Sequence, residues 1–207
     1  MGLDVYFHKV KKVRKSKGEP LKSIEEYSEI ADKRAKDRVV RFGNKVVNAL
    51  ERMDADAYTE FYNKEFIAKL PKYTRYSFRY EDMADEVKDV NEVRVFFTKF
   101  VNYTYAESDA YFRKVNFVYQ FFSDKLEDEC CFVTKSDLED MIDRCDKVLK
   151  NHDLAEKLLP TRSGFFFGST DYDEWYFKDV EDVREQFKKL LDGFNEDTDV
   201  IYVIMSW

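Results

Sequence analysis

The chain has 207 residues, of which 44% are hydrophobic and 17% aromatic, and its 35 basic and 42 acidic side chains leave a formal charge of −7. This composition excludes a disordered chain, because the apolar surface is large enough to offset the entropy of ordering, and 6 glycines and 3 prolines exclude a collagen-like or linker-like chain. Apolar runs of about 18 residues are missing and the chain opens on an acidic segment, Met1–Asp4, so we expect neither a membrane-spanning helix nor a secretory signal.

The first half of the chain predicts one strand and then helices. Residues 3–10 alternate between apolar and polar side chains, which is typical of a strand with one buried face. Residues 11–22 contain glycine and proline and predict a loop. From Ser23, which begins a capping-box pattern, apolar residues recur at helical spacing as far as Met53. A helix of this length is unusual, and we expect Gly43 to bend or break it.

The sequence after this helix carries weaker signals. Residues 61–70 predict another helical segment, which Pro71 ends. Alternation at 75–80 predicts a short strand, in which the arginines and the aromatic residues point to opposite faces. The apolar spacing at 93–101 favours a helix, although its valines and phenylalanines also favour a strand.

The second half begins with a strongly apolar segment, 109–123, whose stripe of aromatic and aliphatic residues predicts a central, largely buried helix. The apolar run 130–133 predicts a strand. Thr134, followed three residues later by an aspartate, predicts the start of a helix whose buried face runs to Leu149.

Three further elements complete the chain. The apolar run 164–168, bounded by glycines, predicts a strand. Asp171 or Asp173 is expected to open a helix whose apolar stripe ends at Leu191. Residues 200–205 are continuously apolar, as in a strand buried on both faces, and we expect this strand to lie near the N-terminal one.

Helices outnumber strands in this reading and do not alternate strictly with them. The pattern predicts the α+β class, with a small mixed or antiparallel sheet packed against several helices. We expect a single domain over residues 1–207, in which a helical segment at about 23–106 is the part defined least by the pattern.

Charge is distributed unevenly along the chain. Residues 1–50 hold 13 basic and 7 acidic side chains, whereas the remainder is strongly acidic. A lysine-rich segment, Lys9–Lys22, could therefore contact nucleic acid, or it could lie against the acidic body of the protein itself. We favour the second reading, because a net acidic protein repels a polyanion at long range, and any nucleic-acid binding is expected to be weak and salt-sensitive.

The cysteines and histidines give no recognisable metal or redox motif. Cys130, Cys131 and Cys145 are odd in number and two are adjacent, which makes a poor disulfide framework, so we expect reduced thiols in a cytoplasmic setting. The two histidines, His8 and His152, stand far from any paired cysteine ligands. We therefore expect no metal and no cofactor.

Known catalytic motifs are also missing from the sequence, including the phosphate-binding glycine loops, the nucleophile elbow and the zinc-protease helix. His8 would share a strand face with Asp4 and could form a base–orienter pair, although such a face is more often simply polar. The segment 168–171 leads into a helix start that could bind an anion, but its own carboxylates favour a self-capped turn.

Arg113 is the charged residue that the pattern leaves without an obvious partner. On a largely buried helix it would need a counter-charge, because a guanidinium stays ionised and an unpaired buried charge is costly. We predict a contact with Asp173 or Glu174, either as a structural ion pair or as part of a ligand clamp.

Several segments resemble a family of uncharacterised proteins from phages, prophages and bacterial genomes, including gut Bacteroides. They are the opening MGLDVY (1–6), YFRKVN (111–116), LPT (159–161), GFFFGS (164–169), YDEWY (172–176) and the final SW (206–207). Tyr119 and Phe121 stand where the family usually has a histidine and a tryptophan, which counts against a shared histidine chemistry there. The resemblance covers about the first ten residues and 107–207, and it implies a phage-related or mobile-element origin in the cytoplasm but no activity.

The leading hypothesis is a phage-related accessory protein that binds a host or phage protein, with no membrane association. An enzyme with an unfamiliar site, or a weak nucleic-acid binder, is the alternative, and catalysis is the less favoured reading. The candidate ligand- or partner-binding residues are Tyr111, Arg113, Asn116, Asp173 and Trp175.

Overall fold

The computed structural model describes residues 2–13, 22–52, 54, 56, 90–102 and 106–207. Contacts divide the chain into two compact units, which we describe separately. Unit 1 comprises residues 1–24 and 108–207, and unit 2 comprises residues 25–107. Unit 2 corresponds closely to the helical segment singled out in the sequence, and the expectation of one domain over the whole chain stays a prediction.

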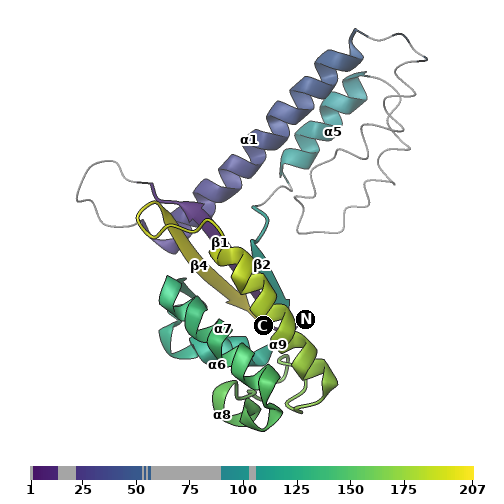
Figure 1. The fold of residues 1–207 in the computed structure, drawn as a ribbon. Coiled ribbons are helices and arrows are strands. Elements are labelled where there is room, and N and C mark those ends of the chain that lie inside the picture. Colours follow the sequence, from purple (N-terminus) through teal and green to yellow (C-terminus); the bar gives the residue numbers. More distant parts are fainter. Residues whose placement is uncertain (1, 14–21, 53, 55, 57–89, 103–105) are drawn as a thin grey trace. The chain divides into compact units, whose positions relative to one another are not determined.

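Unit 1 is built on a four-stranded antiparallel sheet in the order β2-β1-β4-β3 (Figure 1). The strands are β1 (Asp4–Lys11), β2 (Ala110–Arg113), β3 (Cys130–Val133) and β4 (Asp199–Ser206). β1 and β4 pair along their whole length, from Asp4 opposite Ser206 to Lys11 opposite Asp199. The α+β class and the predicted neighbourhood of the first and last strands are therefore confirmed.

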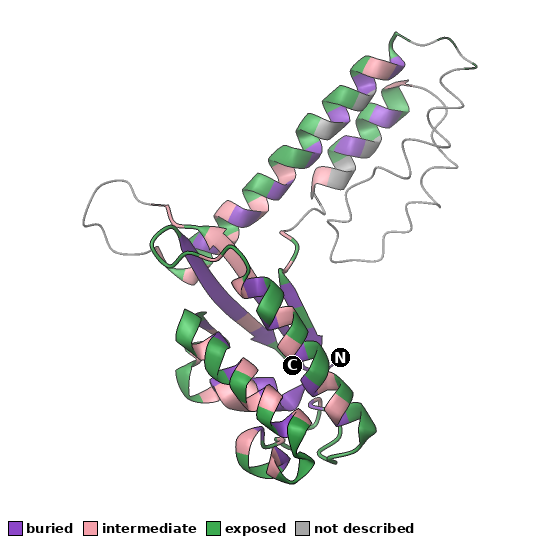
Figure 2. Ribbon diagram, viewed as in Figure 1, coloured by how far each residue is buried: buried purple, intermediate pink, exposed green. Residues whose placement is uncertain are grey.

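The described helices of unit 1 pack on one face of this sheet (Figure 1). They are α6 (Asn116–Phe122), η2 (Ser123–Lys125), α7 (Lys135–Lys150), η3 (His152–Leu154), α8 (Ala155–Leu158) and α9 (Glu174–Leu191). α7 and α9 lie side by side and bury the stripes that the helical spacing predicted. Figure 2 shows β4 buried over nearly its whole length, as the continuous apolar run indicated.

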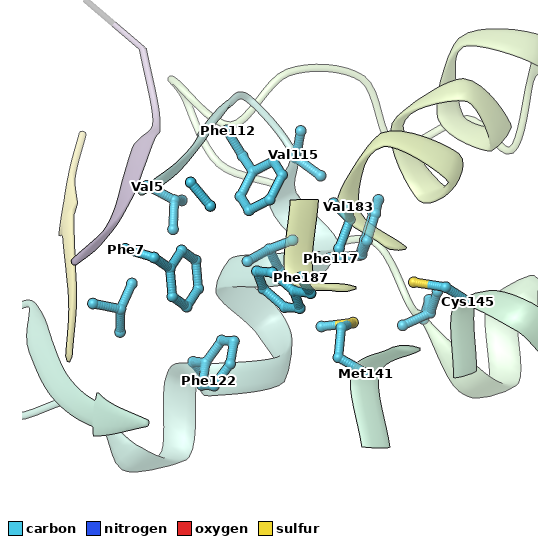
Figure 3. Packing of buried hydrophobic residues seen from close by; sticks show 14 of the residues in the cluster. Val5, Phe7, Phe112, Val115, Phe117, Phe122, Met141, Cys145, Val183 and Phe187 are labelled. Carbon is cyan, nitrogen blue, oxygen red and sulfur yellow. The ribbon is translucent and has the colours of Figure 1, made fainter. Parts of the chain in front are cut away.

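The core of unit 1 is centred on Phe7 of β1 (Figure 3). Its ring meets Phe112 of β2, Phe122 of α6 and Phe187 of α9 edge to face, with centroids 6.0, 5.6 and 4.9 Å away. Such edge-to-face pairs add about 0.5–1.5 kcal/mol each beyond the burial of their area. The alternation of residues 3–10 thus directs one face of β1 into the helix layer.

Two helices of unit 1 begin where the capping signals predicted. At the start of α7, Thr134 and Asp137 form a capping box: each side chain accepts a hydrogen bond from the other residue's backbone N–H. At the start of α9, the carboxylate of Asp173 accepts hydrogen bonds from the backbone N–H groups of Trp175 and Tyr176. Both arrangements satisfy donors that a helix leaves unpaired in its first turn.

The predicted helix over 109–123 is wrong in its first half. Residues 110–113 form β2, which pairs with β1 and directs Ala110 and Phe112 into the core, and only residues 116–122 are helical. Lys114 lies between the two elements with φ of 61°, a left-handed conformation that no regular helix contains. The helical spacing arose because a short strand and a helix, joined in series, bury aromatic residues toward the same core.

The predicted strand over 164–168 is also wrong, because this segment is a turn. The N–H of Phe167 donates to the carbonyl oxygen of Gly164 and closes the turn at 3.1 Å. β2 and β4 already pair with the two edges of β1, so the segment cannot pair with this strand. It contacts the chain just before β1, where the N–H of Leu3 donates to the carbonyl oxygen of Phe166.

Unit 2 contains the described helices α1 (Ile24–Leu50, of which Ile24 belongs to unit 1) and α5 (Val90–Asn102), and α5 confirms the helix predicted at 93–101. The expected break at Gly43 is wrong, because α1 continues through this residue to Leu50. A Cβ at this position would lie 2.7 Å from the ring of Phe97, so glycine here permits close packing on α5. The predicted helical segment 61–70 and strand 75–80 lie outside the described residues.

Candidate functional site

A hollow of about 330 Å³ lies in unit 1, where the end of β2, the start of α6, the Gly168–Asp173 segment and the first turns of α9 meet. Four of the five candidate residues line it: Arg113, Asn116, Asp173 and Trp175. We call this hollow the groove. Its volume is at the lower end of the range of small-ligand sites and suits one or two side chains.

Arg113 and Lys114 form the basic wall of the groove. Arg113 is exposed at the end of β2, and among the described residues no carboxylate lies within ion-pair distance of it. The predicted contact with Asp173 or Glu174 is therefore wrong: on a strand edge the guanidinium reaches water and needs no buried counter-charge. Lys114 likewise has no ion pair within the described part of the chain, and its N–H donates to the carbonyl oxygen of Leu3 at 2.7 Å.

Asn116 is a structural member of this wall. Its side chain is only 3% exposed, and its amide nitrogen donates to the carbonyl oxygens of Phe167 and Ser169 at 3.2 and 2.8 Å. Its amide oxygen accepts from the N–H of Arg162 at 3.3 Å. Both donor hydrogens and one acceptor position are thus used within the protein, so this side chain holds the 162–169 segment in place.

Three carboxylates form the opposite, acidic part of the groove. Asp173 is occupied as the cap of α9, and Asp171 accepts a hydrogen bond from the hydroxyl of Ser169 at 3.0 Å. Asp179 is half-buried and has no hydrogen bond or ion pair within the described residues. Burial, together with the nearby carboxylates of Asp182 and Asp173, raises the pKa of Asp179 above its ordinary value.

Trp175 supplies an exposed aromatic surface beside these charges. Its side chain is 65% exposed, and the ammonium of Lys178 lies 5.5 Å from the ring centroid in a cation–π arrangement. The neighbouring Tyr176 is buried, and its hydroxyl donates to the carbonyl oxygen of Leu159 at 2.7 Å. Burial therefore raises the pKa of Tyr176, which serves the core rather than the groove.

Tyr111, the fifth candidate, lies outside the groove on the edge strand β2. Its ring stacks on Tyr6, and its hydroxyl donates to the carboxylate of Asp4. Its N–H donates to the side-chain oxygen of Gln186, 3.1 Å away, and its carbonyl oxygen accepts from the same amide at 3.4 Å. Gln186 thus covers the open edge of the sheet, where another strand could otherwise pair.

The other hypotheses from the sequence find less support in the described residues. Asp4 accepts from Tyr111 rather than orienting His8, whose ring stacks on Tyr202 with centroids 5.1 Å apart. The described residues contain no group of three or more histidine, cysteine or acidic side chains placed to hold a metal ion. The basic–aromatic stretch 75–80 lies outside the described residues.

The three cysteines are free thiols. Burial raises the pKa of Cys131 and of Cys145 to about 12, and that of Cys130 above its ordinary value. Thiols with raised pKa values are poor nucleophiles at neutral pH. Cys131 and Cys145 pack as small apolar residues of the core.

Described lysines of the basic N-terminal segment bind the acidic body of unit 1. The ammonium of Lys9 donates to the carbonyl oxygens of Leu190 and Asp192, both at 2.9 Å, and Lys11 forms an ion pair with Asp199 at 2.6 Å. Lys12 donates to the carbonyl oxygen of Glu196. These contacts agree with the reading in which this segment lies against the protein itself; residues 14–21 lie outside the described part.

The groove also contains residues that were not among the candidate site residues, including Lys114 and Asp179. Lys114 was assigned to a helix face, and only its position beside Arg113 could have indicated a shared wall. Comparisons of the chain with protein-family models, curated proteins and solved structures find no match. A search of the described residues finds no helix with the length and apolar character needed to cross a membrane.

Proposed function

We propose that the protein acts by binding a protein partner, and that the groove receives a charged segment of this partner. The observation that carries the proposal is the presence, in one hollow, of carboxylates, an exposed indole and two cations, Arg113 and Lys114, that form no ion pair with any described residue. A polypeptide segment offers acidic, basic and apolar groups within a few residues, and so matches all three walls. The resemblance supports the further proposal of a phage-related accessory protein that works in the cytoplasm.

Nucleic acid fits the groove less well than a polypeptide. The acidic wall would repel phosphates, and the whole chain carries a charge of −7. The described lysines of the basic segment are already engaged with unit 1. An acidic side chain of the partner would instead approach Arg113 and Lys114, and its apolar or basic neighbour would contact Trp175 and the free carboxylate of Asp179.

The proposal can be tested by selection from a random dodecapeptide display library on the immobilised full chain. We expect the enriched peptides to share an acidic residue next to an aromatic or basic one. Their binding should be lost with Arg113→Glu, which reverses the charge of the basic wall, and retained with Lys189→Glu, which makes the same change at an exposed position of α9 outside the groove. Peptides that bind both variants equally would refute the assignment to the groove.

A further inference from the structure

Phe165 is the most exposed large apolar side chain among the described residues, at 95% of its surface. It occupies the second position of the turn that the Gly164–Phe167 hydrogen bond closes. Leaving a phenylalanine in water forfeits the stabilisation that burial of its ring would provide. Nothing in the local backbone requires this residue type, because its position in the turn accepts most residues.

Hydrogen bonds hold the segment that carries Phe165 at several points. The hydroxyl of Thr161 donates to the carbonyl oxygen of Thr170 at 3.0 Å and closes the base of the loop. Asn116 binds the backbone of three loop residues, and Leu3 of the sheet binds the carbonyl oxygen of Phe166. The turn is therefore held in one shape before any partner arrives, which lowers the entropy lost on binding.

The base of the turn is also buried. Phe167 is 7% exposed and packs edge to face on Tyr119 and Trp207, with centroids 4.8 and 6.0 Å away. A Cβ on Gly164 would lie 2.8 Å from the ring of Phe167, so the start of the turn is pressed onto this buried ring. Phe165 and Phe167, two positions apart, thus have opposite environments: Phe167 fixes the loop to the core, and Phe165 is exposed to solvent.

We infer that Phe165 is the apolar anchor of the interface, and that it inserts into an apolar pocket on the surface of a globular protein partner. The inference rests on the proposed function, because the same partner would fill the groove. The loop continues directly into the groove wall at Gly168 and Ser169, so one partner can cover both. Aromatic side chains held on a rigid support are the residues that dominate binding energy at such interfaces.

A protein pocket suits this anchor better than a lipid surface does. Stable membrane attachment needs a larger apolar area, or basic residues that attract anionic lipids. Here one exposed ring, which packs edge to face on Phe166 with centroids 4.8 Å apart, projects from a chain with a charge of −7. The fixed loop presents that ring in one orientation, which specific insertion requires and general lipid contact does not.

The first experiment places the photocrosslinker p-benzoylphenylalanine at position 165 of the full chain in the cells that produce it. Irradiation is expected to give one discrete adduct with a different protein, identified by mass spectrometry. The same crosslinker at Val95, an exposed position of α5 with 53% of its surface accessible, serves as the control and should not give this adduct. Absence of an adduct, an adduct only with lipid, or one only with a second copy of this chain would overturn the inference.

The second experiment measures the affinity of the purified adduct protein for the wild-type chain and its variants. Phe165→Ala should weaken binding about 10- to 100-fold, whereas Phe165→Leu should retain most of it. The urea midpoint of Phe165→Ala should match that of the wild type, because an exposed ring contributes little to folding. If Phe165→Ala keeps its affinity and Arg113→Glu loses binding, Phe165 is not the anchor, and the proposed role of the groove is retained. If Phe165→Ala loses binding and Arg113→Glu does not, the proposed role of the groove is refuted.

Discussion

Replacing Asn116 by alanine should destabilise unit 1 more than any other single polar substitution in the groove. The change leaves two carbonyl oxygens and one N–H without their partner, in a site where the side chain is 3% exposed. An unsatisfied buried group costs about 1–3 kcal/mol. The hydrogen bond to the carbonyl oxygen of Phe167 is buried, so its loss should cost the full amount. The hydrogen bonds to Ser169 and Arg162 are part-buried, so water can replace them in part. We therefore expect a loss of about 2–4 kcal/mol in the free energy of unfolding.

Urea unfolding followed by tryptophan emission measures this loss, because both tryptophans of the chain, Trp175 and Trp207, belong to unit 1. Gln120→Ala is the matched control on the same helix: its side chain receives one long contact, 3.4 Å from Arg162, and its removal should cost less than about 1 kcal/mol. A loss below about 0.5 kcal/mol for Asn116→Ala would refute the structural role of this amide.

Asn116→Asp tests the direction of the hydrogen bonds. A carboxylate would face the carbonyl oxygens of Phe167 and Ser169 and repel them, whereas the protonated acid could donate to one of them. The pKa of the new carboxyl group should therefore be raised in the folded state, and stability should fall as pH rises through it. Equal destabilisation at pH 4 and pH 7 would contradict the assigned geometry.

For three further substitutions the structure predicts whether stability rises or falls. Gly43→Ala should lower the stability of unit 2 despite a gain of about 1 kcal/mol in helix propensity, because its Cβ would lie 2.7 Å from the ring of Phe97; hydrogen exchange of α1 amides measures this, and greater protection would contradict it. Burial opposes ionisation of Asp137, but hydrogen bonds from Lys125 and the capping box outweigh it and hold the pKa below its ordinary value. Its stabilising effect is thus present above the unfolded pKa and lost in acid, so the urea midpoint of Asp137→Asn should fall below that of the wild type at pH 7, and the difference should shrink as the pH falls below the unfolded pKa of about 3.9. Asp179 has a raised pKa, so its ionisation works against folding: Asp179→Asn should raise the midpoint at pH 7 and lose this gain below about pH 4, and a lower midpoint at pH 7 would show that the carboxylate has a stabilising partner.

Local signals in the sequence predicted those elements whose ends are set by neighbouring residues. The capping box at Thr134 was predicted correctly, and of the two caps predicted for α9, Asp171 or Asp173, the structure uses Asp173; each cap defines a helix start through contacts within three residues. The alternation of residues 3–10 was equally reliable, because one face of a strand has to be buried whichever strands pair with it. The apolar run 200–205 likewise showed burial on both faces before its partners were known.

The errors fell where contacts distant in the sequence decide the conformation. Residues 110–113 become a strand because β1 offers an edge to pair with, and no residue within the segment shows that this edge exists. The turn at 164–167 depends on Asn116 and Leu3, which lie about 50 and 160 positions away. Gly43 gave a helix-breaking signal that the packing of α5 overrides.

The groove could be predicted in part, since four of the candidate residues line it: two charged residues, one amide and one exposed aromatic residue. What the sequence could not supply is the distance between them. The prediction placed Arg113 inside a helix and so required a carboxylate beside it; on the edge strand the same guanidinium is solvated and free to meet a ligand. Arg113 lines the groove and its role as a binding residue stays a prediction, whereas its assigned partner was wrong because the secondary structure was wrong.

Lys114 combines an unusual backbone conformation with a position on the wall of the groove. It adopts a left-handed conformation that costs a non-glycine residue about 1 kcal/mol or more, and the chain gives it room on both sides with glycines. A Cβ on Gly2 would lie 3.2 Å from its side chain, and one on Gly168, itself at φ of 92°, would lie 3.1 Å from its Cβ. A glycine at position 114 would relieve the strain, yet the sequence has a lysine there, and this residue lines the groove. The strain lies where the chain turns from β2 toward α6, and left-handed residues also stand at Asp128 and Glu129 directly before β3, so this conformation marks tight junctions between elements of the fold.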